Sequence, residues 1–240
     1  MENDTIKDLN KQVQDFYESE GEAFGHTRHH VWELMLYFME RLKPGDVLVD
    51  VGAGNARLLD AVPQGVTYLG IEPSSSLREF ANRRLERHAG SKMIDGGFPI
   101  LNLPDEFADA VTCIAVLHHV PSDDGRRQSI KELHRILKPG GIMVLSVWNL
   151  RAKRFLSWEV FKRAWLRMPG FSGGDRGDLY YSWKAGKIPK SRYVHAFTLN
   201  EFKALFNKDL WKIENIGGYD SRGWISWFRG RNLVAIVKKN

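Results

Sequence analysis

The 240-residue sequence is poor in cysteine and has neither a long apolar run nor an apolar leader. Cys113 is the only cysteine, which excludes a disulfide within the chain and a zinc site built from several cysteines. No stretch of about 18 uncharged apolar residues occurs, so we expect no membrane-spanning helix. The opening residues, MENDTIKDLNKQ, are polar and lack the apolar region of a secretory signal. These features favour a protein of the reducing cytoplasm.

The net charge of +6 is concentrated in one segment. Between residues 151 and 192, eleven lysines and arginines stand against three acids, and nine aromatic residues lie between positions 155 and 193. Basic residues interleaved with aromatic ones are typical of a surface that binds a polyanion with stacking bases, such as a nucleic acid. A solvated helix face beside ordinary core aromatics has the same composition, so both interpretations stay open.

From residue 46 onward, short apolar runs alternate with helical patterns. We expect strands at 46–51, 66–72, 92–95, 108–117, 141–148, 211–219 and 231–239. We expect helices at 5–19, 27–42, 55–62, 75–89, 124–138 and 198–206. Continuous apolar strands in β-α-β alternation imply a parallel sheet covered on both faces. The prediction is an α/β fold with a doubly wound, mostly parallel seven-stranded sheet.

The stretch VDVGAGN places Asp50, Gly52 and Gly54 where the first strand turns into a helix. Glycines at this position let the backbone turn sharply and approach a ligand closely. Glu72 ends the second strand and could accept hydrogen bonds from ribose hydroxyls, while Asp95 ends the third and could accept from an adenine amino group. Carboxyl ends of parallel strands meet at one edge, so we expect these acids to converge. A helix cap or a solvated strand end is the plainer role for each.

Two cofactors compete for this turn. A dinucleotide prefers a third glycine where the chain has Arg57, and its pyrophosphate would stand near the negative Asp50. S-adenosylmethionine has no phosphate, and Asp50 can attract its cationic ammonium and sulfonium groups. The residues therefore favour S-adenosylmethionine.

The residues around this turn resemble the class I S-adenosylmethionine-dependent methyltransferases over about residues 45–148. The resemblance rests on DVGAGN, Glu72, Asp95 and AVLHHV…LKPGG. Four stretches are similar to the tRNA wobble-uridine carboxymethyl methyltransferases, which include the methyltransferase domain of AlkB homologue 8: FYESEGEAFGHTRHHVW, IAVLHHVPSDDGRRQSIKELHRILKPGGIMVLSVW, SRYVHAFTLNEF and GGYDSRGW. This resemblance implies conversion of the carboxylate of 5-carboxymethyluridine in tRNA to its methyl ester. It also implies a small zinc-binding activator subunit, as in eukaryotic relatives.

We expect one domain, 1–240, in four parts: an N-terminal helical cover (1–43), a cofactor-binding core (44–149), a basic-aromatic insertion on the substrate side after the fifth strand (150–197), and a closing helix and strands (198–240). The predicted cofactor contacts are Tyr17, Arg28, Asp50, Gly52, Gly54, Asn55, Glu72, Asp95, Gly96, Ala115 and Val116. The predicted catalytic residues are His118, Arg192, Tyr193 and His195. The predicted substrate contacts are Arg126, Arg127, Trp148, Asn149, Asp220 and Trp224.

The histidine pair is the main ambiguity. A substrate carboxylate is ionised at neutral pH and needs no general base, so the site should hold it with arginine, tyrosine and histidine. His118 is expected in the pocket and His119 to point elsewhere, and adjacent histidines on an extended backbone diverge too far for a metal site. In SRYVHAF, Tyr193 and His195 share a face if the stretch is extended, and Arg192 lies on the other face.

Two other functions stay open. The chain could methylate a small acidic metabolite, with the insertion as a lid, and would then act without RNA. It could instead be an RNA-binding module that keeps the cofactor fold for structure or regulation, although the intact turn and its acids argue against that. Arg126 and Arg127 open a helix, where cations oppose the helix dipole, and this favours a phosphate partner about as much as simple solvation.

Overall fold

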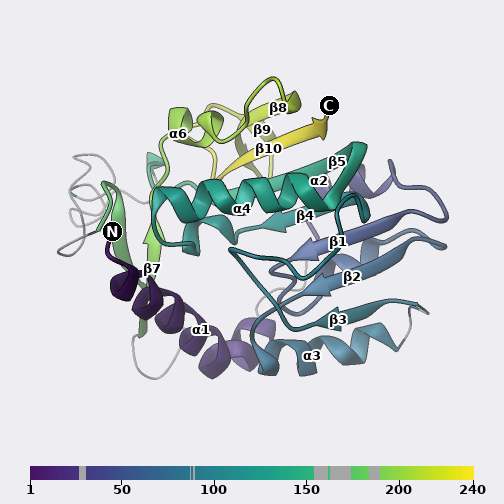
Figure 1. Cartoon of the computed structure of the whole chain (residues 1–240), viewed down its shortest axis with the longest axis horizontal. Helices are drawn as coiled ribbons and strands as arrows, with labels where there is room; N and C mark the ends of the chain where they lie inside the picture. Colours follow the sequence, from purple (N-terminus) through teal and green to yellow (C-terminus); the bar gives the residue numbers. More distant parts are fainter. Residues whose placement is uncertain (27–30, 87, 89, 154–161, 163–173, 184–189) are drawn as a thin grey trace.

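The fold is built on one large sheet. A computed structural model describes residues 1–26, 31–86, 88, 90–153, 162, 174–183 and 190–240. The sheet has eight strands in the order β3-β2-β1-β4-β5-β10-β8-β9 (Figure 1). Their bounds are β1 Val47–Val51, β2 Thr67–Ile71, β3 Lys92–Ile94, β4 Ala108–Ile114, β5 Leu137–Trp148, β8 Trp211–Asp220, β9 Gly223–Ile225 and β10 Asn232–Lys239.

The strands from β3 to β5 are parallel, whereas β10 runs antiparallel to both β5 and β8. All seven predicted strands are present, so the doubly wound, mostly parallel fold is confirmed. The eighth strand, β9, pairs with the end of β8 and was not predicted. Its three residues, Gly-Trp-Ile, are too few to show a strand period.

Helices flank the sheet: α1 Asn3–His26, α2 Glu33–Met39, α3 Ser75–Leu85, α4 Asp123–Ile136 and α6 Leu199–Ala204. The Ser74 hydroxyl accepts a hydrogen bond from the Leu77 amide and caps α3. The predicted helix at 55–62 is only a 3₁₀ turn over Arg57–Ala61, because Ala56 enters it in the left-handed conformation and Pro63 follows it. No described helix is long and apolar enough to cross a membrane.

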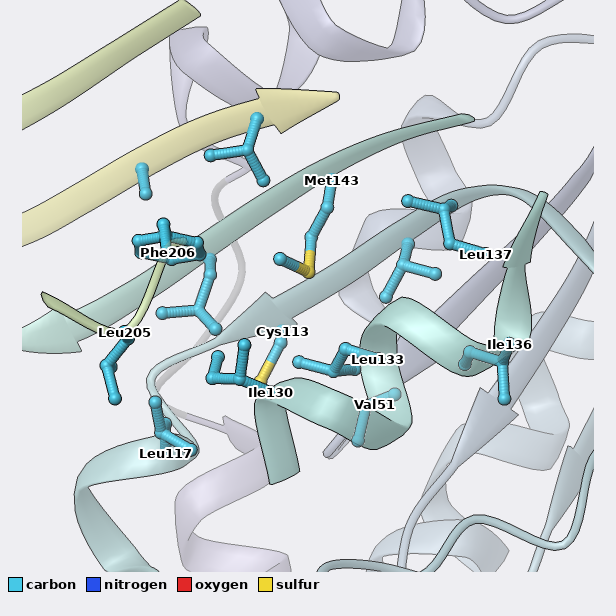
Figure 2. Packing of buried hydrophobic residues seen from close by; sticks show 14 of the residues in the cluster. Val51, Cys113, Leu117, Ile130, Leu133, Ile136, Leu137, Met143, Leu205 and Phe206 are labelled. Carbon is cyan, nitrogen blue, oxygen red and sulfur yellow. The ribbon is translucent and has the colours of Figure 1, made fainter. Parts of the chain in front are cut away.

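Apolar side chains fill the space on both faces of the sheet. On one face, Leu133 and Ile136 of α4 lie against Cys113 of β4 and Met143 of β5 (Figure 2). On the other face, a second cluster joins α2 to β1 and β2, including Phe38. Burial raises the pKa of the Cys113 thiol, so this cysteine behaves as a small apolar core residue.

The described part of the basic-aromatic insertion contains an antiparallel pair of strands, β6 Asp178–Trp183 and β7 Lys190–His195. This pair forms a separate two-stranded sheet. Helix α1 contacts both β7 and α3, so the N-terminal cover links the insertion to the main sheet (Figure 1). Half of the basic and aromatic residues counted in the insertion lie outside the described residues.

A capping box starts α6. The Thr198 hydroxyl accepts from the Glu201 amide (3.0 Å), and the Glu201 carboxylate accepts from the Thr198 amide (2.7 Å). Thr198→Ala should therefore lower the free energy of unfolding by about 1 kcal/mol, measured by urea denaturation. Thr198→Ser keeps the hydroxyl and should retain most of that stability. Equal losses in the two variants would contradict the capping role.

Candidate active site

A cavity of about 870 Å³, including its open mouth, lies at the carboxyl ends of β1, β2, β4 and β5. Ligands of doubly wound sheets bind at this edge. The cavity is lined by Val13, Tyr17, Asp50, Gly52, Ala53, Gly54, Asn55, Arg57, Leu58, Glu72, Pro73, Leu77, Ile114, Ala115, Val116, His119 and Trp148. Eight of the eleven predicted cofactor contacts are in this set: Tyr17, Asp50, Gly52, Gly54, Asn55, Glu72, Ala115 and Val116.

The glycine turn lies where backbone and cavity come closest. Gly52 has φ +69°, and a Cβ on it would lie 2.2 Å from a side-chain methyl of Val116. Gly54 also has a positive φ (+56°), but a Cβ there would meet open space. The first glycine is therefore required by packing as well as by conformation, and the second leaves the backbone open toward the cavity.

Asp50 is almost fully buried and is held from both sides of β1. Its carboxylate accepts hydrogen bonds from the Tyr68 hydroxyl of β2 (2.8 Å) and the Thr112 hydroxyl of β4 (2.7 Å). Burial raises the pKa of Asp50 to about 6, although both hydrogen bonds and the nearby Arg57 favour the ionised form. The central position of β1 supplies a donor from each neighbouring strand.

Glu72 is the second buried acid of the cavity. It accepts hydrogen bonds from the backbone amides of Gly54 (2.9 Å) and Ser74 (3.0 Å), and burial raises its pKa to about 7. Two buried carboxylates in one cavity are costly to ionise, and a ligand with positive charge and hydroxyl donors lowers that cost. S-adenosylmethionine carries both kinds of group, so the residues fit it. A pyrophosphate would add negative charge beside Asp50.

His119, rather than His118, reaches the cavity. Strand β4 ends at Ile114, Ala115 has φ +60°, and a 3₁₀ turn spans Leu117–His119, so the alternation of an extended strand does not continue to the histidines. The structure therefore reverses the two expected placements: His119 lines the cavity and His118 does not. The fully buried His118 ring lies 4.7 Å from the Trp148 ring, and its Nδ1 accepts from the Trp148 amide (3.4 Å).

The tautomer of His119 follows from its partners. Its Nδ1 lies 3.0 Å from the backbone carbonyl oxygen of Tyr193, which can only accept, so Nδ1 carries the proton. Burial, with a contribution from Arg192, lowers the pKa of His119 to about 3, so the ring is neutral at physiological pH. Nε2 is then an acceptor, and the Tyr17 hydroxyl donates to it (2.9 Å). His119 therefore joins α1 to β7 at the cavity wall.

Arg192 lies directly behind two walls of the cavity. Its guanidinium carbon lies 4.3 Å from the ring centroid of Phe16, 4.9 Å from that of Trp148 and 5.6 Å from that of Tyr17. Trp148 and Tyr17 line the cavity, and the Arg192 side chain is fully buried. Three rings thus hold a positive charge just behind the cavity wall, and Arg192 itself does not line the cavity.

Tyr193 and His195 point to the opposite face of β7, where both contact Asp178. The Tyr193 hydroxyl donates to Asp178 (2.8 Å), and His195 Nδ1 lies 2.7 Å from the same oxygen. Burial raises the pKa of the Tyr193 phenol and lowers the pKa of His195. Neither ring lines the cavity, and in the structure both hold the hairpin through Asp178. Asp178 had no motif in the sequence to single it out.

Arg126 belongs to the same buried network. It donates to the Tyr193 hydroxyl (3.2 Å), and it forms an ion pair with Asp175 (3.1 Å) that fastens the hairpin to α4. Arg127 is half exposed and pairs with Asp123 of its own helix (2.7 Å). Both arginines are therefore engaged by acids of this chain, and neither lines the cavity.

Several other predicted residues also lie away from the cavity. Asp95 is exposed and pairs with Arg78 (2.8 Å), because β3 ends at the sheet edge and α3 reaches over it. Gly96, Asn149, Asp220 and Trp224 are also absent from the lining. Arg28 lies outside the described residues. Among the described histidines, cysteines and acids, no group of three or more is arranged to hold a metal ion.

Comparison with known proteins assigns the class. Residues 49–145 match the family model described as a methyltransferase domain. Solved methyltransferases at 13–18% identity superpose with TM-scores of 0.63–0.65. A putative methyltransferase in complex with the Trm112 activator of Haloferax volcanii gives a TM-score of 0.62 at 16% identity, over 96% of each chain. The chain therefore contains a methyltransferase domain at 49–145 and has the fold of the solved S-adenosylmethionine-dependent methyltransferases, and S-adenosylmethionine is its cofactor.

Within that class, the chain resembles the tRNA (carboxymethyluridine(34)-5-O)-methyltransferases. It is 32% identical to the Arabidopsis thaliana enzyme over 58% of this chain and 33% of the relative. It is 26% identical to the Schizosaccharomyces pombe enzyme over 90% of this chain and 94% of the relative. The matched part spans 24–35% of the length of the first five curated relatives.

Cofactor affinity should depend on the ionisation of Asp50. Its pKa of about 6 means that the carboxylate gains its negative charge as pH rises through that value, so affinity for a cationic ligand should rise too. From about pH 7.5 to about pH 5.5, affinity for S-adenosylhomocysteine should fall at least about fourfold in calorimetric titrations. Asp50→Asn should bind weakly and keep only the pH dependence that Glu72 supplies. Affinity that is constant or rises toward low pH would contradict this assignment.

The Tyr17–His119 hydrogen bond can be tested by a double-mutant cycle. Tyr17→Phe, His119→Phe and the double variant should give a coupling of about 1 kcal/mol in the free energy of unfolding, because each single change removes the same bond. The pair Tyr17→Phe and Thr198→Ala, which share no contact, serves as the additive control. Additivity of the first pair would show that this bond does not connect α1 to the cavity wall.

Proposed function

We propose that the protein transfers a methyl group from S-adenosylmethionine to the carboxylate of 5-carboxymethyluridine at the wobble position of tRNA. The observation that carries the proposal is the buried Arg192 guanidinium behind Tyr17 and Trp148, beside a cavity that fits the cofactor. A permanent cation at this rim suits an anionic substrate group. Similarity to the fission yeast enzyme over 90% of this chain supports the same substrate.

The proposed reaction needs positioning more than acid-base chemistry. When bound, S-adenosylmethionine supplies an electrophilic methyl group; the new bond forms to a carboxylate oxygen, and the electrons of the broken S–C bond remain on sulfur. A carboxylate with a pKa near 4 is already ionised, so no proton has to leave it. His119 is neutral and has both ring nitrogens engaged, so it holds the wall and does not act as a base.

The negatively charged acids and the positively charged arginine each attract a different reactant. Asp50 and Glu72 favour the cationic and hydroxyl-bearing parts of the cofactor at the floor of the cavity. Arg192 favours the anionic acceptor at the rim. A neutral or cationic acceptor would lose that attraction, so we extend the proposal to a preference for carboxylates. This separation aligns the two reactants without a catalytic base.

We further propose tRNA and a small zinc-binding activator as partners. The excess of basic and aromatic residues between 151 and 193 supports RNA as the partner. The activator is proposed because of the family resemblance and the similarity in fold to the Haloferax volcanii methyltransferase in its Trm112 complex.

The proposal predicts a labelled, base-labile methyl ester on 5-carboxymethyluridine when tRNA containing this nucleoside is incubated with protein and isotopically labelled S-adenosylmethionine. Nucleoside-resolved mass spectrometry reads it out. Arg192→Ala should reduce transfer by about 100-fold or more while keeping cofactor affinity, because the charge that attracts the acceptor is lost and the acids that face the cofactor stay in place. Arg192→Lys keeps the charge without the planar group and should be intermediate.

Two outcomes would contradict the proposal. Label on a small acid but on no tRNA nucleoside would favour a metabolite methyltransferase. Absence of label with cofactor bound, both alone and with a Trm112-type activator, would show that this reaction is wrong. If Arg192→Ala also lost cofactor binding, the arginine would be a structural residue.

A further inference from the structure

A second basic surface lies between β8 and β10, in the segment 221–231, whose sequence is SRGWISWFRGR. It holds three arginines and no acid, and Arg222, Arg229 and Arg231 are all exposed. Arg222 pairs with Asp220 (2.9 Å). Within the part of the chain that the structure describes, Arg229 and Arg231 form no ion pair, although the charge of Arg231 adds to the hydrogen bonds from Arg222 in lowering the pKa of Asp220. Two exposed cations thus remain available to an anionic partner.

This segment, which we call the arginine loop, lies at the same edge of the sheet as the cavity. Asn232, the first residue of β10, pairs with Trp148, the last residue of β5, and also with Tyr219 near the end of β8. Trp148 lines the cavity. Figure 1 shows β10 running opposite to β1 and β2, so it begins at the edge where those strands end. The arginine loop is therefore next to the cavity wall.

The backbone of the arginine loop is held firmly. The Asn149 side-chain amide donates to the carbonyls of Trp227 and Gly230, and the Asn149 backbone amide donates to the carbonyl of Arg231 (3.0 Å). A Cβ on Gly230 would lie 2.6 Å from the backbone nitrogen of Tyr219, so the loop and β8 are in close contact. Asn149 thus anchors this loop rather than lining the cavity. A preorganised backbone lowers the ordering cost of binding.

The loop also offers an aromatic surface. Trp224 of β9 is 37% exposed, and its ring packs edge-on against Tyr219 at 5.5 Å. Guanidinium groups bind phosphates, and exposed tryptophan faces stack on bases. Two exposed arginines and one exposed tryptophan on a rigid loop match a nucleic-acid backbone with unpaired bases better than an apolar protein surface.

We propose that the arginine loop is a second RNA contact of this protein, in which Arg229 and Arg231 bind phosphates flanking the nucleotide that enters the cavity. The inference rests on the proposed function, because it takes RNA as the substrate. This contact is separate from the RNA contact predicted for the insertion, because the arginine loop is a different segment of the chain. The arginine loop lies at the β8–β9 end of the sheet, and β3 lies at the other end. Trp224 adds stacking to the phosphate contacts.

The test compares Arg229→Ala/Arg231→Ala with the matched control Lys203→Ala/Lys208→Ala. Lys203 and Lys208 are also exposed and lie outside the arginine loop, and Lys208 lies three residues before β8, whose first residue pairs with Lys239 near the end of β10. RNA affinity of the full chain saturated with S-adenosylhomocysteine is measured with a tRNA across a salt series. Losing two phosphate contacts should lower the slope of log affinity against log salt by about 1.4 to 1.8 and weaken binding by about tenfold or more. Cofactor affinity should stay unchanged, and the lysine control should match the wild type.

Two results would overturn the inference. The first is a wild-type salt slope for Arg229→Ala/Arg231→Ala, which would favour an acidic protein as the partner of the loop. The second is an equal loss of RNA affinity in the arginine and lysine variants, which would show that only the total positive charge matters. Failure of the proposed function is read separately, as absence of methyl transfer by the wild type. A chain that binds tRNA with the predicted slopes but transfers no methyl would contradict the function and support the loop. Turnover on the free nucleoside should be equal in the arginine pair and the wild type.

Discussion

Two buried carboxylates at the carboxyl edge of the sheet constrain the rest of the structure. Asp50 needs a donor from each neighbouring strand, and it obtains them from Tyr68 and Thr112 only because β1 lies between β2 and β4. Glu72 needs the amide of Gly54, which ties the first turn to the second strand. The strand order and the glycine turn thus supply the donors that keep both acids in place and poorly solvated. A cationic ligand completes the site.

The cover above the acids is assembled by polar contacts from distant parts of the chain. His119 connects Tyr17 of α1 to the backbone of β7, and Asp178 connects β7 to β6. Because these groups are buried and engaged with one another, they serve to position Trp148 in the cavity wall and Arg192 directly behind it. The resulting site has negative charge at its floor and positive charge at its rim. That polarity suits transfer of a methyl group from a cation to an anion.

Sequence reasoning identified the sheet and the floor of the site because both depend on local signals. Apolar runs give the strands, and a glycine turn followed by acids at strand ends gives Asp50 and Glu72. The exchange of His118 and His119 escaped prediction because it depends on the left-handed Ala115 and the turn after it. The pairing of Asp95 with Arg78 of α3 was not predicted, and Asp178 was missed because its partners lie on another element. Long-range pairing of polar groups leaves no periodic mark in a sequence.

A crystal structure with S-adenosylhomocysteine would show whether Asp50 and Glu72 hold the cofactor. The account predicts that the ribose hydroxyls lie within hydrogen-bond distance of Glu72, that the amino group of the ligand lies on the Asp50 side, and that the Gly54–Glu72 bond persists. The sulfur should face the rim formed by Tyr17, Trp148 and Arg192. A ligand bound away from these acids, or with its ribose and amino group exchanged, would contradict the account.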